Sequence, residues 1–396
     1  MRIIEMNRAH RAIVLALSLL AIACDDGMAG DGGLRDGGTA SDAGPRGDGG
    51  PRTDAGPRRD GSVGTDAGVD GGGPPLADVH FLGRFEIAAM DDARFAWPGS
   101  SVRARFDGTA ISVTLEDGGN GMLDVEIDGT VVDVLTPSGG SGTYELASGL
   151  AAGQHDVAIT RRTESFFGAT RFRGFSGATL VPSPAPARFI EMVGDSITCG
   201  YGVLGPNESC GFSADTEAET HAWGAIAAAD LDAAHVAIAY SGKGVVRNYG
   251  GDTSDRLPQI YDRVFADDGG TTYGFDQYTP DVVVINLGTN DYSVGDPGMA
   301  FEDQLATFVG VIRGHYPDAW IILATSPMLG GADHAAHLAH LQSVDTALGD
   351  ARVDVLDLAP QDGGANGLGC DYHPSEATQA IMATALAARI RMLTGW

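Results

Sequence analysis

Positive charge is scarce in this sequence. Its 25 Lys and Arg residues are outnumbered by 53 Asp and Glu residues among 396, which leaves a formal net charge of −28 at pH 7. A protein that binds nucleic acid or an anionic membrane surface needs a positive face for the phosphate groups. The composition therefore argues against both as direct partners.

A hydrophobic run long enough to span a bilayer is missing from the N-terminal region. Arginines at positions 2, 8 and 11 precede an apolar segment over 12–23, which is too short to cross a membrane comfortably and is typical of an export signal. The segment ends in Leu20-Ala21-Ile22-Ala23-Cys24, which resembles a bacterial lipobox with its large residue displaced by one position. We interpret residues 1–24 as a signal and favour lipidation at Cys24 over ordinary cleavage. Either route predicts an exported protein, at the cell surface or in the periplasm if lipidated and otherwise secreted.

Cysteine is rare, with four residues in the chain. Apart from Cys24 these are Cys199, Cys210 and Cys370, and an odd number outside the cytoplasm predicts one disulfide and one free thiol. The sequence leaves the pairing open. A bridge to Cys370 would tie together two segments that carry candidate catalytic residues.

Large apolar residues are almost absent from residues 25–77, where Asp, Gly, Ala, Pro and Arg recur in near-repeats. Such a segment cannot bury enough apolar surface to offset the entropy of ordering. We expect a disordered tether that holds a folded domain away from the membrane.

From residue 78 the pattern changes to strict alternation of apolar and polar residues in short segments. Turn signals such as Asp107-Gly108, Gly118-Gly119 and Asp128-Gly129 separate these segments. Short alternating strands at this spacing are typical of an antiparallel β-sandwich. We place this domain at 78–183, followed by a linker that contains Pro182, Pro184 and Pro186.

Residues 188–396 alternate between short apolar runs and helical patterns, which predicts an α/β domain with a parallel sheet covered on both faces. The predicted strands are 189–193, 236–240, 282–287, 321–324 and 353–356, and the predicted helices are 223–231, 299–316, 335–348 and 376–392.

Polar residues with a role in acyl transfer follow these strands. Ser196 comes directly after the first strand, at the edge where open α/β sheets place their sites, and is a candidate nucleophile rather than only a helix cap. His373, ahead of the last helix, is the candidate base. The backbone N–H groups of Ser196 and Gly242 and the side-chain amide of Asn290 are candidate donors to the oxyanion.

Other polar residues near these segments are candidates for orienting the base, contacting substrate or holding the loops. Asp371 is the candidate acid that orients His373, although a backbone carbonyl is an alternative and would leave a Ser–His dyad. Lys243, Arg247 and Tyr372 are candidate contacts for substrate hydroxyls or rings. Asp195 and Asp291 are assigned to holding their loops.

The sequence motifs together resemble a known superfamily. Gly194-Asp195-Ser196, Gly242, Gly288-x-Asn290-Asp291 and Asp371…His373 resemble the four blocks of the SGNH (GDSL) hydrolases. Three longer segments resemble carbohydrate esterase family 2 more closely: 196–202, 241–249 and 370–374. The superfamily spaces Asp and His three residues apart, whereas Asp371 and His373 are two apart.

This resemblance implies a jelly-roll β-sandwich followed by a three-layer α/β/α SGNH domain. It implies a serine esterase that removes acetyl groups from polysaccharides such as xylan or glucomannan, with no metal and no cofactor. An SGNH lipase or thioesterase and a non-catalytic glycan-binding protein are the alternatives. We expect a monomer, and we interpret His334, His337 and His340 as a solvated helix face rather than a metal site.

Overall fold

The computed structural model describes residues 76–396, all of which fall in one compact unit. The predicted signal, Cys24 and the tether up to residue 75 lie outside the described residues. Within 76–396, none of the helices combines the length and the apolar character that crossing a membrane requires.

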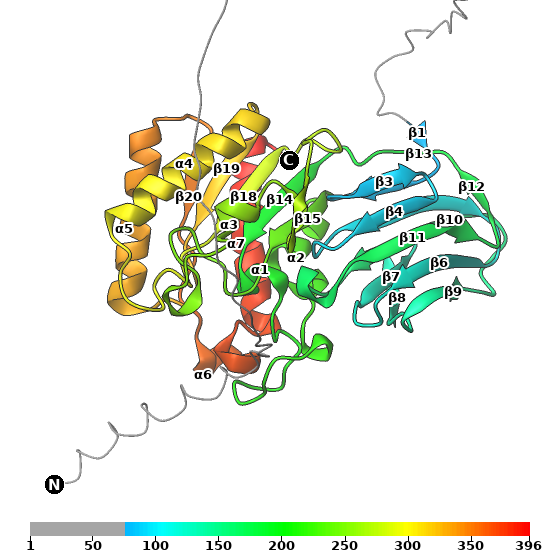
Figure 1. The fold of residues 1–396 in the computed structure, drawn as a ribbon, viewed down its shortest axis with the longest axis horizontal. Coiled ribbons are helices and arrows are strands. Elements are labelled where there is room, and N and C mark those ends of the chain that lie inside the picture. Colours follow the sequence, from blue (N-terminus) through cyan, green and yellow to red (C-terminus); the bar gives the residue numbers. More distant parts are fainter. Residues whose placement is uncertain (1–75) are drawn as a thin grey trace, which may run out of the picture. The chain divides into compact units, whose positions relative to one another are not determined.

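Two antiparallel sheets form the predicted β-sandwich, and both lie in the blue-to-green part of the ribbon in Figure 1. The first sheet contains β2 (His80–Leu82), β5 (Ser101–Asp107), β7 (Leu123–Ile127), β8 (Thr130–Leu135), β10 (Gln154–Arg161) and β12 (Thr179–Val181). The second contains β3 (Glu86–Ala89), β4 (Asp92–Phe95), β6 (Ile111–Asp117), β9 (Gly140–Ala147) and β11 (Thr170–Ser176). A further two-stranded pair joins β1 (Leu76–Ala77) to β13 (Ser183–Pro184).

The apolar residues that alternate along these strands form the interior of the sandwich. Val102 and Phe106 on β5 and Val113 and Leu115 on β6 are fully buried in one cluster. Their polar neighbours point outward because successive side chains of a strand face opposite sides of the sheet. The period-two pattern therefore identified the inward faces correctly.

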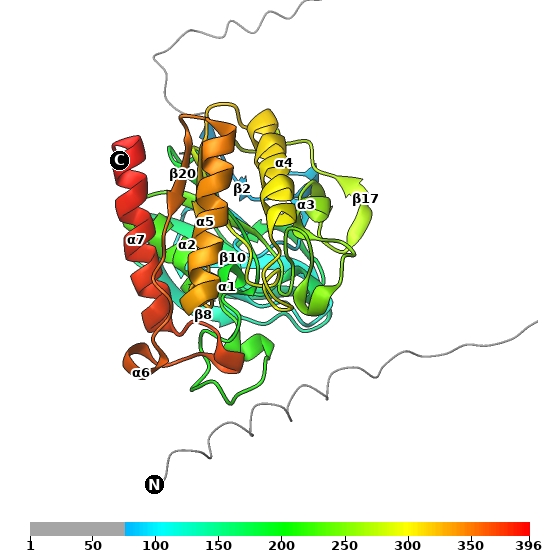
Figure 2. The ribbon, with the colours of Figure 1, turned by 90° about the vertical axis from the view of Figure 1, so that its left-hand side faces the viewer.

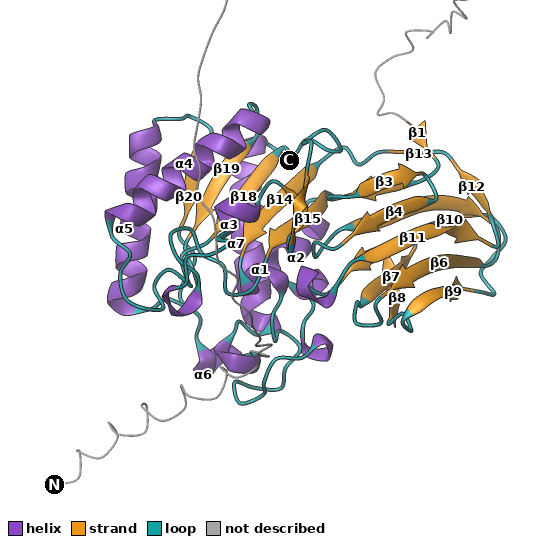
Figure 3. Cartoon of the chain, in the orientation of Figure 1, coloured by secondary structure: helices purple, strands orange, loops and turns teal. Residues whose placement is uncertain are grey.

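A five-stranded parallel sheet follows the sandwich, in the order β15-β14-β18-β19-β20. The strands are β14 (Phe189–Gly194), β15 (Ala234–Ala239), β18 (Val282–Asn286), β19 (Trp320–Ala324) and β20 (Val353–Leu356). A two-stranded hairpin, which the sequence patterns did not predict, joins β16 (Arg263–Phe265) to β17 (Asp268–Thr272). Figure 3 shows the contrast between this region, where helices surround strands, and the all-strand sandwich.

Helices cover both faces of the parallel sheet, so the predicted three-layer architecture is confirmed. α1 (Ser196–Cys199), α2 (Trp223–Asp230) and α7 (Glu376–Thr394) share a buried cluster with one face. α3 (Leu257–Ile260), α4 (Met299–His315) and α5 (Gly331–Leu348) share a cluster with the other face. α4, α5 and α7 are seen side-on in Figure 2. The short helix α6 (Gly363–Asn366) precedes α7, and five 3₁₀ turns lie in the loops: η1 (Ser165–Phe167), η2 (Ala214–Thr216), η3 (Glu219–His221), η4 (Tyr249–Gly251) and η5 (Cys370–Tyr372).

The sandwich shares buried surface with the parallel-sheet region. Leu82, Ala96 and Trp97 of the sandwich belong to the same hydrophobic cluster as α3, α4 and α5. The indole N–H of Trp97 donates to the carbonyl of Arg263 at 3.2 Å. The two regions predicted as separate domains therefore share part of one core.

Candidate active site

Ser196 lies at the point where β14 ends and α1 begins. A side chain at Gly194 would collide with Thr198, so glycine is required at the end of this strand. Asp195 caps the helix, because its carboxylate accepts the N–H of Ile197 at 3.1 Å. Ser196 is therefore the first residue of α1, with 7 % of its surface exposed.

The imidazole of His373 contacts this serine. Nε2 of His373 lies 2.8 Å from Oγ of Ser196, although 177 positions separate them in the sequence. Nδ1 faces two backbone carbonyls, of Cys370 and Asp371, each at 3.2 Å. A proton on Nδ1 satisfies these carbonyls and leaves Nε2 free to accept the serine hydroxyl. Burial lowers the pKa of His373 to about 4, so the ring is neutral at pH 7.

The predicted role of the Asp371 side chain is wrong in this structure. Its carboxylate accepts a hydrogen bond from the hydroxyl of Tyr201 at 2.7 Å instead of contacting the imidazole. Asp371 and the next residue, Tyr372, have φ of 51° and 64°, in the left-handed region, and with this backbone the Asp371 side chain reaches Tyr201 while its carbonyl faces the ring. The carbonyl of Asp371 takes the place of its carboxylate, as the alternative interpretation proposed.

A disulfide holds the segment that carries His373. Cys210 is bonded to Cys370, whereas Cys199 is a buried free thiol, which settles the pairing that the sequence left open. The N–H of Asp371 also donates to the carbonyl of Cys210 at 3.1 Å. Because Cys370 supplies one of the carbonyls that face Nδ1, this bridge helps to orient the imidazole.

The loop after β15 presents Gly242. This glycine has φ of 79°, in the left-handed region that favours glycine, and no atom of the described part of the chain would lie within 4 Å of a Cβ. Glycine is therefore needed at 242 for its backbone conformation, not for lack of space. Within residues 76–396, neither the N–H of Ser196 nor that of Gly242 donates to a protein acceptor.

The amide of Asn290 is engaged more fully than the sequence suggested. Its Nδ2 donates to Asp195 Oδ2 at 3.1 Å and to the carbonyl of Lys243 at 2.8 Å. Both hydrogens of the amide therefore have acceptors, and a third acceptor would have to share one of them. Burial raises the pKa of the Asp195 carboxyl to about 7.

Asp291 and Arg247 hold the loops of the site. The Asp291 carboxylate accepts the N–H groups of Val245, Val246 and Arg247 at 2.7–3.1 Å. The Arg247 guanidinium donates to the carbonyls of Asp291 and Gly295. These contacts give Arg247 a structural role in holding two loops together. They do not support its predicted contact with a sugar.

Two exposed tyrosines lie next to the reacting groups. Tyr372, directly before His373, is 62 % exposed. Tyr249, whose N–H donates to the carbonyl of Gly242 at 2.8 Å, is 70 % exposed. Lys243 is half-buried, with Nζ 5.2 Å from the ring centre of Tyr240, and burial lowers its pKa.

A row of aromatic rings leads away from the imidazole. Tyr201 stacks on His373 with ring centres 4.1 Å apart, and Phe212 stacks on Tyr201 at 4.3 Å. Phe166 lies 5.7 Å from Phe212 and 6.0 Å from Tyr240. The row therefore connects the candidate base to residues of the sandwich.

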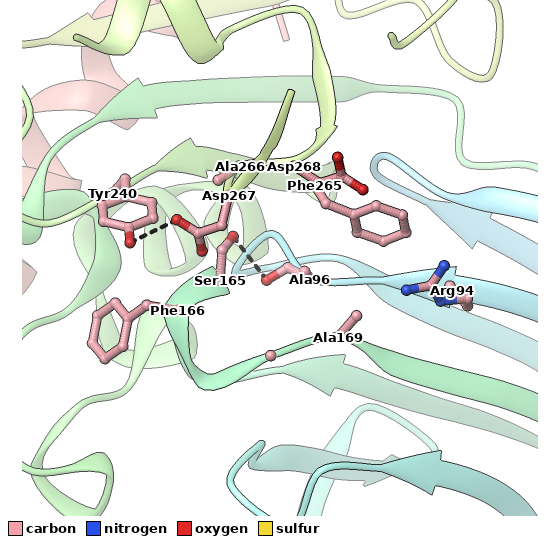
Figure 4. Close-up of a pocket in the computed structure, with 11 residues that line it drawn as sticks. Arg94, Ala96, Ser165, Phe166, Ala169, Tyr240, Phe265, Ala266, Asp267 and Asp268 are labelled. Atoms are coloured by element: carbon pink, nitrogen blue, oxygen red, sulfur yellow. Dashed lines mark hydrogen bonds between the residues drawn. The ribbon is translucent and has the colours of Figure 1, made fainter. Parts of the chain in front are cut away.

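The row ends at a surface hollow of about 450 Å³, shown in Figure 4. Both the sandwich and the parallel-sheet region line it, with Arg94, Phe166, Tyr240, Phe265, Asp267 and Asp268 as its larger side chains. The Tyr240 hydroxyl donates to Asp267 at 2.9 Å across one wall. Aromatic faces beside carboxylates and a guanidinium suit a ligand that has both apolar faces and hydroxyls.

The three histidines of α5 are not a solvated face, contrary to our interpretation. His337 is fully buried, and burial lowers its pKa to about 4. His334 pairs with Asp357 at 2.9 Å, and His340 contacts Glu302 and Asp296. Elsewhere in the described part of the chain, Glu164, Cys199 and Glu217 bring potential metal-ligand atoms within 4.8 Å of one another.

Sequence reasoning missed two residues that shape the site. Tyr201 stacks on His373 and was marked only as part of a matching motif. Glu164 contacts the loop of Gly242 from the sandwich, and no motif or periodicity singles it out. A residue of this kind becomes visible only when distant segments are packed together.

Comparisons with known proteins agree with this geometry. Residues 81–184 match the model of the carbohydrate esterase 2 N-terminal family, and residues 192–381 match that of the GDSL-like lipase/acylhydrolase family. A family two carbohydrate esterase from Clostridium thermocellum, solved in complex with cellohexaose, is 35 % identical with a TM-score of 0.76. The match covers 80 % of this chain and 99 % of that one. This chain belongs to carbohydrate esterase family 2.

Two curated proteins are also similar to this family 2 chain. The cellulase/esterase CelE of Acetivibrio thermocellus is 36 % identical over 325 residues, 80 % of this chain but only 40 % of that protein. An acetylxylan esterase / glucomannan deacetylase of Cellvibrio japonicus is 27 % identical over 80 % of this chain and 89 % of its own length. The chain thus spans less than half of the first relative and most of the second.

Proposed function

We propose that this family 2 chain is a serine esterase that removes acetyl groups from O-acetylated carbohydrates of the xylan or glucomannan type. The observation that carries the proposal is the 2.8 Å contact between Ser196 Oγ and His373 Nε2, beside two backbone N–H groups with no protein acceptor in the described residues. A nucleophile, a neutral base and free donors are the parts that acyl transfer needs.

In the proposed mechanism, Ser196 Oγ attacks the acetyl carbonyl while Nε2 of His373 takes its proton. The proton on Nδ1 stays hydrogen-bonded to the carbonyls of Cys370 and Asp371, which stabilise the imidazolium in place of a carboxylate. The tetrahedral oxyanion is held by the N–H groups of Ser196 and Gly242. Asn290 contributes by sharing a hydrogen that it now directs to Asp195 or Lys243.

The imidazolium then gives its proton to the departing sugar oxygen, which leaves an acetyl-enzyme on Ser196. Water attacks this ester with His373 again as base, and acetate leaves as the serine regains its proton. Each donor to the oxyanion in such sites contributes ~2.7–4 kcal/mol to transition-state stabilisation. No step in this sequence requires a metal or a cofactor.

The choice of substrate rests on exposed aromatic rings and on the relatives. Tyr249 and Tyr372 expose most of their surface beside the reacting groups, as surfaces that stack on sugar rings do. The hollow of about 450 Å³ at the end of the aromatic row offers room for neighbouring sugar units of a polymer. One similar protein is named an acetylxylan esterase / glucomannan deacetylase, and another, a family two carbohydrate esterase, was solved with cellohexaose.

The proposed location rests on the sequence outside the described residues. An export signal ending at Cys24 and a polar tether suit an esterase displayed on the cell surface or in the periplasm through a lipid anchor, as a monomer. Labelling with a radioactive fatty acid, abolished in Cys24→Ala, tests the anchor.

The decisive experiment for the activity compares chromogenic acetyl and octanoyl esters. We expect rapid acetyl hydrolysis that disappears in Ser196→Ala, and acetate release from acetylated xylan or glucomannan. Faster octanoyl turnover would favour a lipase. Binding of glycans without any serine-dependent hydrolysis would favour a glycan-binding protein.

A further inference from the structure

A buried glutamate of the sandwich contacts the turn that presents Gly242. Glu164 lies between β10 and η1 and has no exposed surface. One oxygen of its carboxylate accepts the backbone N–H of Ser241 at 2.6 Å, and the other accepts the Ser241 hydroxyl. Ser241 directly precedes Gly242, so both bonds restrain the residue whose carbonyl group forms the peptide unit that carries the Gly242 N–H.

The sandwich holds Glu164 rigidly through Arg161, at the end of β10. The Arg161 guanidinium is fully buried and donates to the carbonyls of Thr163, Glu164 and Gly168 at 2.8–3.1 Å. It also donates to the hydroxyl of Thr170 at 2.8 Å. These bonds lock the loop over 163–168, which leaves the Glu164 carboxylate little freedom to move.

A second buried carboxyl lies behind the first. An oxygen of Glu217 lies within 4.8 Å of an oxygen of Glu164 and of the Cys199 sulfur. Neither oxygen of Glu217 accepts a hydrogen bond from the described residues. Two carboxylates this close in a buried site cannot both be ionised, so one of them holds a proton.

The hydrogen bonds decide which carboxyl keeps the proton. Glu164 accepts two hydrogen bonds from Ser241, which favour its charged form, whereas neither Glu217 oxygen has a hydrogen-bond partner within residues 76–396. Burial raises the pKa of both carboxyls, but the neighbouring Glu164 charge raises that of Glu217 further, well above its usual value. A neutral Glu217 can direct its proton toward Glu164, and such a hydrogen bond favours the charged form of Glu164.

We infer that Glu164 is a positioning residue for the oxyanion donor Gly242, with Glu217 as the neutral carboxyl that supports it. The inference rests on the proposed acyl-transfer function. It makes the sandwich a part of the catalytic machinery, because the carboxylate that orients the Ser241–Gly242 turn comes from outside the parallel-sheet region.

The inference predicts a kinetic effect that a purely structural contact would not produce. Removal of an oxyanion donor lowers kcat by roughly 100–1,000-fold in known enzymes, and a donor that is only misaligned should cost less, about 10–100-fold. The substrate binds through other groups, so KM should change little. Loss of kcat at constant KM is therefore the expected signature.

The test measures kcat and KM on a chromogenic acetate ester for four variants. Glu164→Ala should lower kcat about 10–100-fold, and Glu164→Asp, whose shorter carboxylate draws back from Ser241, about 10-fold. Glu164→Gln keeps one acceptor for the Ser241 N–H and should restore kcat to within about 5-fold of wild type. Ser241→Ala loses only the hydrogen bond from the hydroxyl, so its kcat should also lie within about 5-fold of wild type.

Glu219→Gln is the matched control. Glu219 is equally buried, but it contacts His235 at 3.1 Å and has no bond to the Gly242 turn. This variant should lose thermal stability while its kcat stays at the wild-type value.

Unchanged kcat in a folded Glu164→Ala variant would overturn the inference. If that variant does not fold, unchanged kcat in Glu164→Asp has the same meaning. A wild-type enzyme with no Ser196-dependent hydrolysis would instead reject the proposed function, and this inference with it. An active wild type with unaffected Glu164 variants would reject the inference alone.

Discussion

Two buried glutamates join the sandwich to the parallel-sheet region, and they differ in how their charge is balanced. Glu191, on β14, lies 3.6 Å from the guanidinium of Arg84 and accepts the hydroxyls of Tyr261 and Tyr278 at 2.5 Å each. Glu164 accepts two bonds from Ser241 and has no ion pair among the described residues.

The difference matches the position of each contact. Arg84 is also covered by the rings of Tyr261 and Tyr273 at 4.5 and 4.7 Å, so the charge of Glu191 is balanced by a cation, although Nε and Nη2 of Arg84 have no hydrogen-bond partner among the described residues. The Glu164 contact adjoins the Ser241–Gly242 turn and contains a second carboxyl, Glu217; neither carboxyl forms an ion pair among the described residues, although the buried Arg161 charge acts on Glu217. Poorly compensated buried charge is typical of sites where a structure serves function at some cost in stability.

The largest effect should come from removing the base in the parallel-sheet region. His373→Ala leaves Ser196 without a proton acceptor and should lower kcat on the order of 10⁴–10⁶-fold. Hydrolysis of an aryl acetate measures this loss of kcat, and melting curves verify that the variant is folded. Residual activity near the wild-type level would mean that another group serves as base.

Breaking the ion pair between Arg84 and Glu191 should lower stability but leave the chemical step unchanged. Arg84→Met leaves Glu191 buried without a cation, which should lower the free energy of unfolding by about 3–5 kcal/mol. Urea unfolding measures the loss, and kcat of the folded enzyme at low temperature should stay unchanged. Addition of Glu191→Gln should recover part of the stability. A selective drop in the kcat of Arg84→Met would mean that the Glu191 contact, like the Glu164 contact, supports catalysis.

Removing the disulfide should lower both the stability of the protein and its kcat. Cys210→Ser frees Cys370, and loss of a native bridge costs on the order of 2–5 kcal/mol. Because the Cys370 carbonyl faces Nδ1 of His373, kcat should also fall, by about 10-fold. Thermal melting and steady-state kinetics, compared with wild type under oxidising conditions, test both parts. Unchanged kcat would show that the turn around His373 holds its shape without the bridge.

The smallest effect concerns the pH profile. His373 must be neutral to act as base, and its pKa is about 4, so kcat/KM should stay level above pH 5 and fall as the pH drops through about 4. The negative charge of Asp371 favours the protonated imidazole, so Asp371→Asn should move the midpoint to lower pH. Circular dichroism at pH 4 controls for unfolding. Loss of most of the activity at pH 7 in Asp371→Asn would instead show that the carboxylate is the group that orients His373.

The sequence by itself determined the architecture and predicted Ser196 and His373 as the candidate reacting pair. Alternation along strands and helical periodicity are properties of a few neighbouring residues, so the inward faces of β5 and β6 and the three layers around the parallel sheet could be predicted. Since parallel strands end at one edge, Ser196 and the Gly242 loop were expected to lie near each other, and the motif order placed His373 with them.

Only the tertiary structure decided which groups support that pair. The left-handed backbone at Asp371 and Tyr372 turned a predicted acid toward Tyr201, and the packing of two loops joined Cys210 to Cys370. The contact of Glu164 with Ser241 connects positions 77 residues apart, from different sheets. Local patterns cannot specify such partners, because they depend on where whole elements come to lie against one another.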